Sequence, residues 1–511
     1  MSPYQSGFRP GDSTINQLIS ITTEIYEAFE NHDEIRAVFL DISKAFDKVW
    51  HEGLLHKLKE NGITGSVYHL LEDYLSNRKQ RVVLNGIESE WEDVLSGVPQ
   101  GSVLGPLLFL IYINDLTDGI FSRIRLFADD SSLFARVTDI NATHDQLLKD
   151  LDLITNWAHQ WKMKFNPDIS KQAIEVIFSH KHNKPNHPLL SFNNIPVARE
   201  NHTKHLGLVL DDRLSFRKHI HDAIQKANTG LALMKYLSSF VSRHILNMTY
   251  KLYVRPHLDY GDIIFHDQLS DMMKSIESVQ YKAALIVTGS WPGTNRLRLY
   301  EEVGWESLSD RIIYRRFALF FKILKNDAPS YLFDHIHELP NEANMTRRYK
   351  NSFYVFCQRN WVSLDERIKK LANVDLFKRN YLRITGIRPL GNSVYKINDK
   401  YGLSLLTRIR LKFSDLREHR FNHHFNCQSA MCKCALENET SEKFLLRCPR
   451  FSAQRRVMLD SVFELCKINV ENLVNDSTTK LFLYGDERYN SITNKLILEI
   501  TITGRFKNIE A

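Results

Sequence analysis

Three aspartates combine a side chain and a position that suit chemistry on a charged substrate. Asp41 follows a short apolar run, Ala37–Leu40, which fits a buried strand, and Asp129 and Asp130 lie between two apolar arms. Carboxylates that converge at the end of a sheet repel one another unless a cation neutralises them. Their oxygens suit Mg²⁺, and two such ions can activate a primer 3′-hydroxyl and stabilise a leaving pyrophosphate. An Asp-Asp pair can also simply form a good turn, so the surrounding sequence must discriminate.

The stretch through about residue 215 alternates between helical and strand patterns. Apolar residues recur at threes and fours over Thr14–Phe29, which predicts a helix. Arg125–Arg136 places two apolar arms around a polar centre, which predicts a β-hairpin with two carboxylates at its tip. Further predicted elements are a helix over Leu54–Leu75 interrupted at Asn61–Gly62, a strand at Arg81–Leu84 entering the tight turn Asn85–Gly86, and a buried helix over Val103–Leu116. From Asp212 to Pro340 the period is helical almost throughout.

Composition excludes several classes of protein. The chain has 511 residues, of which 43% are hydrophobic and 25% charged, as in a folded soluble protein rather than a disordered or collagen-like one. The longest apolar run, Val103–Ile113, is too short to span a membrane, and no secretory signal is expected at the start. Six cysteines are too few for a disulfide scaffold, which suits a reducing compartment.

Positive charge is concentrated in residues 341–420. This stretch carries a net charge of +11 and the remainder −4, within a total of +7. The concentration indicates a polyanionic partner, nucleic acid first, although a solvated helix face is the alternative. Aromatic residues among these charges could stack on unpaired bases of a nucleic acid, or could form the core of the segment. They are Tyr349, Phe353, Tyr354, Phe356, Trp361, Phe377 and Tyr381.

Six sequence blocks occur in one order around the aspartates. They are Gln5–Gly11, Asp41–Val49, Ser96–Pro106, Phe127–Asp130, Trp157–Asn166 and His205–Asp211. These blocks resemble the polymerase blocks of reverse transcriptases, specifically those of non-LTR (LINE) retrotransposons of the jockey type. The resemblance is strong over residues 4–220 and looser to about 340. It implies an α+β fold, in which a right-hand polymerase palm with partial fingers precedes a mostly helical thumb and C-terminal region.

The resemblance also implies a division of the chain and an activity. The parts are partial fingers (1–35), a palm (36–215), a helical thumb-like region (216–340), a basic helical nucleic-acid-binding region (341–426) and a cysteine-containing C-terminal region (427–511). The activity is RNA-directed DNA polymerisation, with dNTPs, an RNA template and a DNA primer or target as partners. A cytoplasmic and a nuclear phase are implied by the family only.

Individual roles follow from the resemblance. Asp41, Asp129 and Asp130 would be the catalytic ligands of two Mg²⁺ ions, which Mn²⁺ can replace, with the Ile42 carbonyl completing the shell. Phe46 matches the aromatic steric gate that excludes a 2′-hydroxyl, although a core phenylalanine is the alternative. The remaining positions are the nucleotide contacts Gln100, Gly101 and Ala128, and the primer turn Leu206 and Gly207.

The first recognisable block begins at about Gln5, whereas family members carry an upstream fingers segment and an endonuclease. The resemblance therefore implies an N-terminally truncated element copy, with activity possible but impaired. One alternative is an inactive copy that acts only as a nucleic-acid-binding protein. The other is a domesticated polymerase, such as a maturase or telomerase relative.

The cysteines Cys432, Cys434 and Cys448 invite a zinc interpretation. Relatives of this family carry a histidine shortly before the last cysteine, and Lys443 occupies that position here. Lysine is not a zinc ligand at neutral pH, so the zinc signal is weak. Cys427, His423 or His424 could substitute, or the cysteines could be buried free thiols in a small helical domain.

Overall fold

The computed structural model describes the chain except residues 167, 169–171, 183–184, 266–269, 340–344, 386–399, 467–481, 484–490 and 498–511. The basic stretch and the cysteine-containing region, as predicted, therefore lie partly outside the described residues. The chain divides into two compact units, the first made of Met1–His219, Gly261–Leu269 and Arg315–Phe377, the second of Ile220–Tyr260, Ser270–Tyr314 and Lys378–Ala511. No described helix is both long and apolar enough to cross a membrane.

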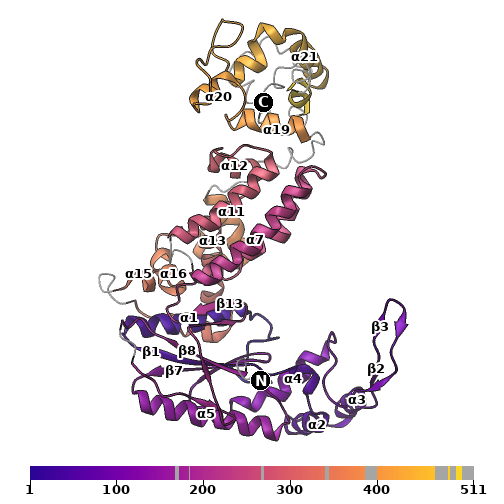
Figure 1. The fold of residues 1–511 in the computed structure, drawn as a ribbon, viewed down its shortest axis with the longest axis vertical. Coiled ribbons are helices and arrows are strands. Elements are labelled where there is room, and N and C mark those ends of the chain that lie inside the picture. Colours follow the sequence, from indigo (N-terminus) through magenta and orange to yellow (C-terminus); the bar gives the residue numbers. More distant parts are fainter. Residues whose placement is uncertain are drawn as a thin grey trace. The chain divides into compact units, whose positions relative to one another are not determined.

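The first unit is built on a five-stranded sheet with the order β11-β8-β1-β7-β6. The strands are β1 (Glu34–Leu40), β6 (Arg123–Phe127), β7 (Asp130–Val137), β8 (Ala173–Phe178) and β11 (Ala198–Arg199). Helices α1 (Thr14–Glu30) and α5 (Ile140–Gln160) cover opposite faces of this sheet (Figure 1). Every residue of the central strand β1 is therefore buried, as is usual for a strand covered on both faces. The predicted α+β class and the predicted helix over Thr14–Phe29 are confirmed.

Further helices of the first unit pack beside the sheet. They are α2 (His51–Glu60), α3 (Gly65–Leu75) and α4 (Leu104–Ile113), with 3₁₀ turns at Ala45–Lys48 and Asn114–Thr117. The predicted break near Asn61–Gly62 lies between α2 and α3 and is confirmed. The helix predicted over Val103–Leu116 is α-helical to Ile113 and then tightens into the second 3₁₀ turn.

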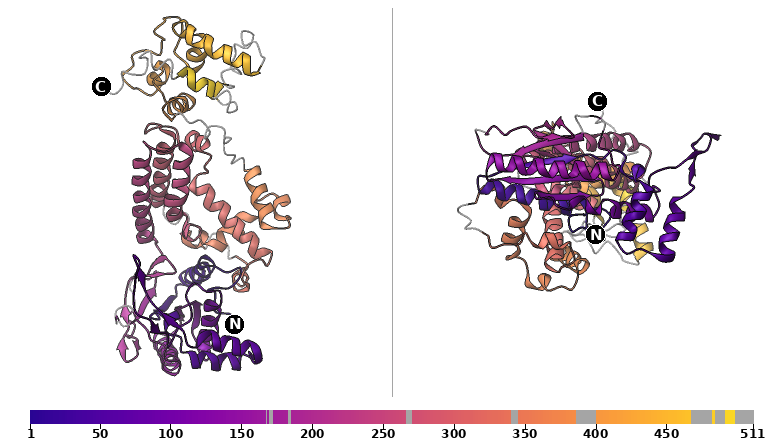
Figure 2. Two further views of the ribbon diagram at one scale, coloured as in Figure 1. Left: turned by 90° about the vertical axis from the view of Figure 1, so that its right-hand side faces the viewer. Right: turned by 90° about the horizontal axis from the view of Figure 1, so that it is seen from below.

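A narrow pair of ladders projects after α3, where Figures 1 and 2 show it extending away from the sheet. The strands are β2 (Lys79–Gln80), β3 (Val83–Leu84), β4 (Ile87–Glu88) and β5 (Glu92–Asp93), paired β2 with β5 and β3 with β4. Asn85 and Gly86 both have positive φ, as a two-residue hairpin turn of this kind requires. The hairpin predicted at Asn85–Gly86 is therefore confirmed.

The first unit also contains two short hairpins and a set of later helices. The hairpins are β9 (Ser191–Phe192) with β10 (Ile195–Pro196), and β12 (His202–His205) with β13 (Leu208–Asp211). Helix α1 contacts α10 (Asp262–Phe265), α14 (Ser330–Phe333), α15 (Arg347–Lys350) and α16 (Phe353–Trp361). The segment 315–377 therefore packs on the same helix that covers the sheet.

The described residues of the second unit are mainly helical, with one isolated antiparallel bridge between Met431 and Asn438. Its helices include α8 (Arg243–Thr249), α9 (Arg255–Asp259), α11 (Ser270–Thr288), α12 (Arg296–Val303), α19 (Lys400–Arg410), α20 (Arg417–Asn422) and α21 (Ser452–Cys466). The unit boundaries fall within three other helices, α7 (Arg217–Leu237), α13 (Leu308–Leu324) and α18 (Val374–Ile384). Helix α17 (Glu366–Lys369) belongs to the first unit. The buried Arg243 guanidinium binds Glu302 and Thr407, and Arg410 binds the same glutamate. These charged contacts join α8, α12 and α19.

A buried ion pair joins β1 to β8. Arg36 Nε donates to Glu175 Oε1 at 2.7 Å, and both side chains are fully buried. Arg199 Nε donates to the other carboxylate oxygen at 2.8 Å. Removing one partner of such a pair leaves an uncompensated buried charge, which is far more costly than losing a surface pair.

We expect Glu175→Gln to lower the free energy of unfolding by about 3–5 kcal/mol, because Arg36 would lose its buried counter-charge. Urea unfolding followed by circular dichroism measures this change. Asp93→Asn is the matched control, since its pair with Lys79 is exposed and should be worth less than about 1 kcal/mol. Equal losses in the two variants would contradict the prediction.

Candidate active site

Strand register brings Asp41 to the tip of the β6–β7 hairpin. Leu40 on β1 pairs with Ser131 on β7 in an antiparallel ladder. The next residue along the chain, Asp41, therefore lies opposite Asp130. Phe127 pairs with Asp130, which leaves Ala128 and Asp129 as a two-residue turn. The hairpin with two carboxylates at its tip is thus confirmed, and all three predicted aspartates lie at one end of the sheet.

The carboxylates at this end interact electrostatically. Partial burial, together with Asp129 and Asp41, raises the pKa of Asp130 from 3.8 to about 6. Burial and the charge of Asp41 also raise the pKa of Asp129. Asn166 Nδ2 donates to Asp41 Oδ2 at 2.7 Å, a partner that its sequence block did not reveal. Across the described part of the chain, Cys432, Cys434 and Cys448 are the only group of three or more candidate metal ligands within 4.8 Å of one another, so the three aspartates do not form such a group.

The N-terminal segment holds the turn that carries Asp129. The Gln5 side chain accepts a hydrogen bond from the Ala128 N–H at 2.9 Å and donates one to the Ala128 carbonyl at 3.4 Å. The same amide oxygen accepts from the Gly7 N–H at 2.8 Å. A Cβ on Gly7 would lie 2.3 Å from the Ala128 nitrogen, so only glycine permits this approach. Ala128 itself has a φ of 55°, a strained value for a residue other than glycine, and Gln5 stabilises it.

Apart from Ala128 in the β6–β7 turn, the predicted nucleotide contacts lie on the segments that follow β1 and precede α4. The half-buried Phe46 ring stacks on Phe109 at 4.5 Å and meets Phe8 edge-on at 5.9 Å. Gln100 Nε2 donates to Asp47 Oδ1 at 2.7 Å. Gly101 has a φ of 79°, and a Cβ there would meet open space. Ile42 is buried and bridges to Phe165.

A cavity of about 1,000 Å³ adjoins Asn166, the hydrogen-bond partner of Asp41. Its lining includes Lys48, Lys162 and Lys164. Burial, then the charges of Lys164 and Lys44, lower the pKa of Lys48, so Lys48 lies near these two ammonium groups. Sequence reasoning did not single out these lysines, because lysine is common on any surface and nothing in the spacing marks a cavity wall.

The predicted primer turn is a two-residue hairpin turn. Leu206 and Gly207 both have positive φ and connect β12 to β13. The neighbouring His205 ring lies 4.9 Å from the Phe39 ring of β1. The turn is therefore attached to the central strand, and its role at a primer end stays a prediction.

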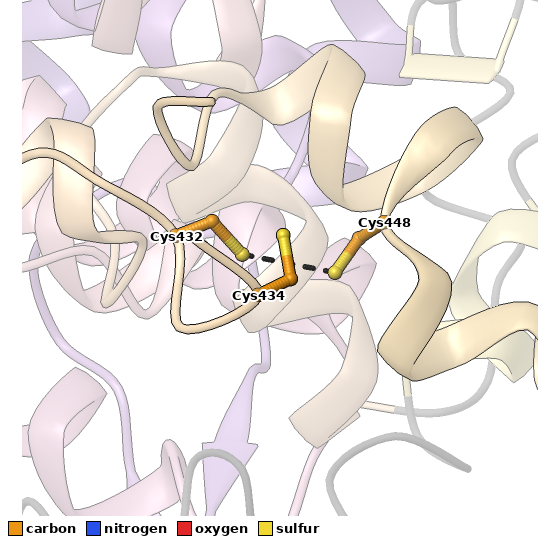
Figure 3. A group of neighbouring side chains, drawn as sticks. All are labelled: Cys432, Cys434 and Cys448. Carbon is orange, nitrogen blue, oxygen red and sulfur yellow. Dashed lines mark hydrogen bonds between the residues drawn. The ribbon is translucent and has the colours of Figure 1, made fainter. Parts of the chain in front are cut away.

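The three cysteines gather as Figure 3 shows. Cys432 Sγ lies 3.7 Å from Cys448 Sγ, and Cys434 completes a group whose sulfurs are all within 4.8 Å of one another. All three are free thiols. Structural zinc is held by four ligands, so this group offers one too few.

Two of the three substitutes considered for the fourth zinc ligand, Cys427 and His423, bind elsewhere, and Lys443 forms an ion pair. Cys427 Sγ donates to the carbonyls of Arg417 and Ser429, and His423 Nε2 contacts the Lys412 carbonyl at 3.3 Å. Lys443 Nζ donates to Glu437 Oε1 at 2.8 Å. Within the described residues the cluster therefore remains a three-thiol group, and the zinc prediction gains no fourth ligand.

Several aromatic residues of the basic stretch are buried. Phe353, Tyr354, Phe377 and Tyr381 are 3%, 2%, 0% and 7% exposed. Trp361 stacks on Phe377 at 6.0 Å with an interplanar angle of 12°. The four buried rings therefore form part of the hydrophobic core and offer no surface on which bases could stack, as the core alternative predicted.

Comparisons with known proteins show what the region that contains the three aspartates is similar to. The reverse transcriptase (RNA-dependent DNA polymerase) family matches residues 1–210. The chain is 31% identical over 317 residues to the probable RNA-directed DNA polymerase from transposon X-element of Drosophila melanogaster, covering 60% of this chain and 34% of the relative. It is 30% identical over 300 residues to the RNA-directed DNA polymerase from mobile element jockey and 29% over 296 residues to the probable one from transposon BS, both of Drosophila melanogaster, covering 56% of this chain and 32% of each relative.

The predicted resemblance to non-LTR, jockey-type reverse transcriptases is thereby confirmed. The chain spans about a third of the length of these relatives. The match to the family ends at the β12–β13 hairpin, so it covers the sheet and the three aspartates.

We expect Asp130→Asn to raise the unfolding midpoint at neutral pH. The pKa of Asp130 is raised in the folded chain, so stability falls as pH rises from about 4 to about 6 and stays lower above it. The variant should exceed the wild type above pH 6 and match it near pH 4. Thermal unfolding in EDTA across this range is the measurement, with Asp152→Asn on the exposed face of α5 as control. A pH-independent difference would refute this origin.

Proposed function

We propose that the chain is the RNA-directed DNA polymerase part of a non-LTR, jockey-like retrotransposon protein, because the reverse transcriptase family matches residues 1–210 and the jockey protein is 30% identical over 300 residues. It adds deoxynucleotides to a primer 3′-hydroxyl on an RNA template. The observation that carries the proposal is the register that puts Asp41 opposite Asp130 beside the Asp129 turn. Three carboxylates at one end of the sheet, within the region that matches the family, fit polymerisation better than a structural turn.

The aspartates are suited to hold divalent cations. Raised pKa values of Asp129 and Asp130 mean that their charges lack sufficient compensation from the protein, as expected of residues that receive cations. Oxygen-only donors favour Mg²⁺, with Mn²⁺ as a substitute. Two ions bound there would lower the barrier for attack by the 3′-hydroxyl and for departure of pyrophosphate. Asn166 orients Asp41, and the Ile42 carbonyl is the proposed additional donor.

The groups around the aspartates would select and position the nucleotide. Phe46 is braced by Phe109 and Phe8, so its ring cannot easily yield to a 2′-hydroxyl. Gln100, Gly101 and Ala128 are the proposed contacts to nucleotide and template, and Gly101 leaves room for a close approach. Lys48, Lys162 and Lys164 give the adjoining cavity the positive charge that phosphates require. Leu206 and Gly207 are proposed to hold the primer end.

The fingers, palm, thumb and C-terminal regions keep their predicted limits as part of this proposal. An inactive copy that only binds nucleic acid is the second candidate. The concentrated positive charge of residues 341–420 suits this candidate as well as it suits the polymerase. Polymerisation by the purified chain discriminates between the two candidates.

Primer extension on an RNA template with Mg²⁺ or Mn²⁺ should show incorporation that Asp129→Asn abolishes, because a metal ligand is lost while the fold persists. Asp152→Asn, an exposed carboxylate on α5, should retain full activity. Template binding without incorporation by the wild-type chain would establish the binding-protein alternative instead.

Gln5→Met should lower the extension rate by roughly 10- to 100-fold, because the Asp129 turn loses the side chain that fixes its geometry. It should also raise the Mg²⁺ concentration that gives half-maximal activity. Gln146→Met is the control, since this α5 glutamine donates only to Ser122 among the described contacts. If the two variants share a lowered unfolding midpoint and an unchanged Mg²⁺ dependence, Gln5 contributes stability alone.

A further inference from the structure

The second unit contains a cavity of about 500 Å³ lined by aromatic and charged side chains. Its walls come from the loop after α11 and from the chain around and after α20, and include Trp291, Asp415, Arg420, His424, Phe425 and Asn426. A volume of this order is typical of sites for one small ligand, about 300–1,000 Å³, and excludes a duplex. The cavity is built from different residues than the polymerase site.

The aromatic walls are held in place from behind. The buried Phe413 ring packs edge-on against Trp291 at 6.2 Å and against Phe425 at 5.4 Å. The Arg408 guanidinium lies 4.5 Å from the centre of the Trp291 ring, and its Nε donates to the Gly289 carbonyl at 3.0 Å. Trp291 is half-buried and Phe425 is 42% exposed, so both rings keep surface for a ligand.

The charges of the cavity select the ligand's sign. Aromatic walls alone would also suit a quaternary ammonium group. Arg420 lines the cavity and Arg408 covers Trp291, whereas Asp415 is the one carboxylate among the lining residues. A flat ring attached to an anion therefore fits better than a cation, and a nucleotide combines these two features.

The position of these rings contrasts with the basic stretch. There, the aromatic residues that sequence suggested for stacking are largely core, since Tyr354 and Phe377 are 2% and 0% exposed. Trp291 and Phe425 combine accessibility with neighbouring guanidinium groups, which is the arrangement that proteins use to bind unpaired bases.

We propose that this cavity binds one unpaired nucleotide of a single-stranded nucleic acid, with the base against Trp291 and Phe425 and the phosphate at Arg420. The site goes beyond the polymerase reaction and needs none of the three aspartates. RNA and DNA share the chemistry that it recognises.

The test uses the purified full chain and short fluorescein-labelled oligonucleotides of one mixed sequence, as single-stranded RNA, single-stranded DNA and blunt duplex. Phe425→Ala should weaken binding of a single strand by roughly 5- to 150-fold, the usual effect of losing one stacked base. Arg420→Ala should reduce the slope of log affinity against log salt by about one. Phe421→Ala is the matched control, because Phe421 is 46% exposed on α20 but does not line the cavity.

Each outcome has a defined meaning. Selective loss of single-strand binding in Phe425→Ala supports the proposal, and the comparison of RNA with DNA then identifies the preferred strand. Equal losses for single strand and duplex, or equal effects of Phe425→Ala and Phe421→Ala, overturn it. The proposal is also overturned if an acidic peptide displaces the labelled oligonucleotide as effectively as unlabelled RNA does. The binding assay contains no dNTPs and its result does not depend on polymerisation, which separates the site from the proposed polymerisation.

Discussion

Repulsion among three carboxylates is the constraint on which the first unit depends. Asp41, Asp129 and Asp130 lie at one end of a sheet, and burial with mutual charge raises the pKa values of the last two. An arrangement of this kind destabilises the folded chain, so the surrounding structure must hold the residues against it. In the site that we propose, a bound cation would remove this repulsion.

The restraint comes from both sides of the hairpin. On one side, β1 is the fully buried central strand, which fixes the register that leads to Asp41. On the other side, the Gln5 side chain binds the backbone of Ala128. The Tyr331 hydroxyl donates a hydrogen bond to Asp12 at 2.8 Å and lies 3.5 Å from Ser6 Oγ. The N-terminal segment is thus anchored by α14, which is more than 300 residues away in sequence.

Much of the first unit could be predicted from local patterns. The α1 helix, the two-residue turn at Asn85–Gly86 and the β6–β7 hairpin follow from apolar periodicity and turn residues, which act over a few neighbours. The contacts of Gln5 with Ala128 and of Asn166 with Asp41 join positions 123 and 125 residues apart. No local pattern encodes such partners, so the block order indicated the aspartates but not what holds them.

The basic region illustrates the opposite limit of sequence reasoning. Composition showed where positive charge is concentrated, yet it cannot tell an aromatic ring that stacks on a base from one that fills a core. Phe377 and Tyr354 became core because segment 315–377 must cover α1 and its own helices. Phe425 stays accessible because Phe413 fills the space behind it. Burial, rather than residue type, therefore decides which aromatic residues remain available to a nucleic acid.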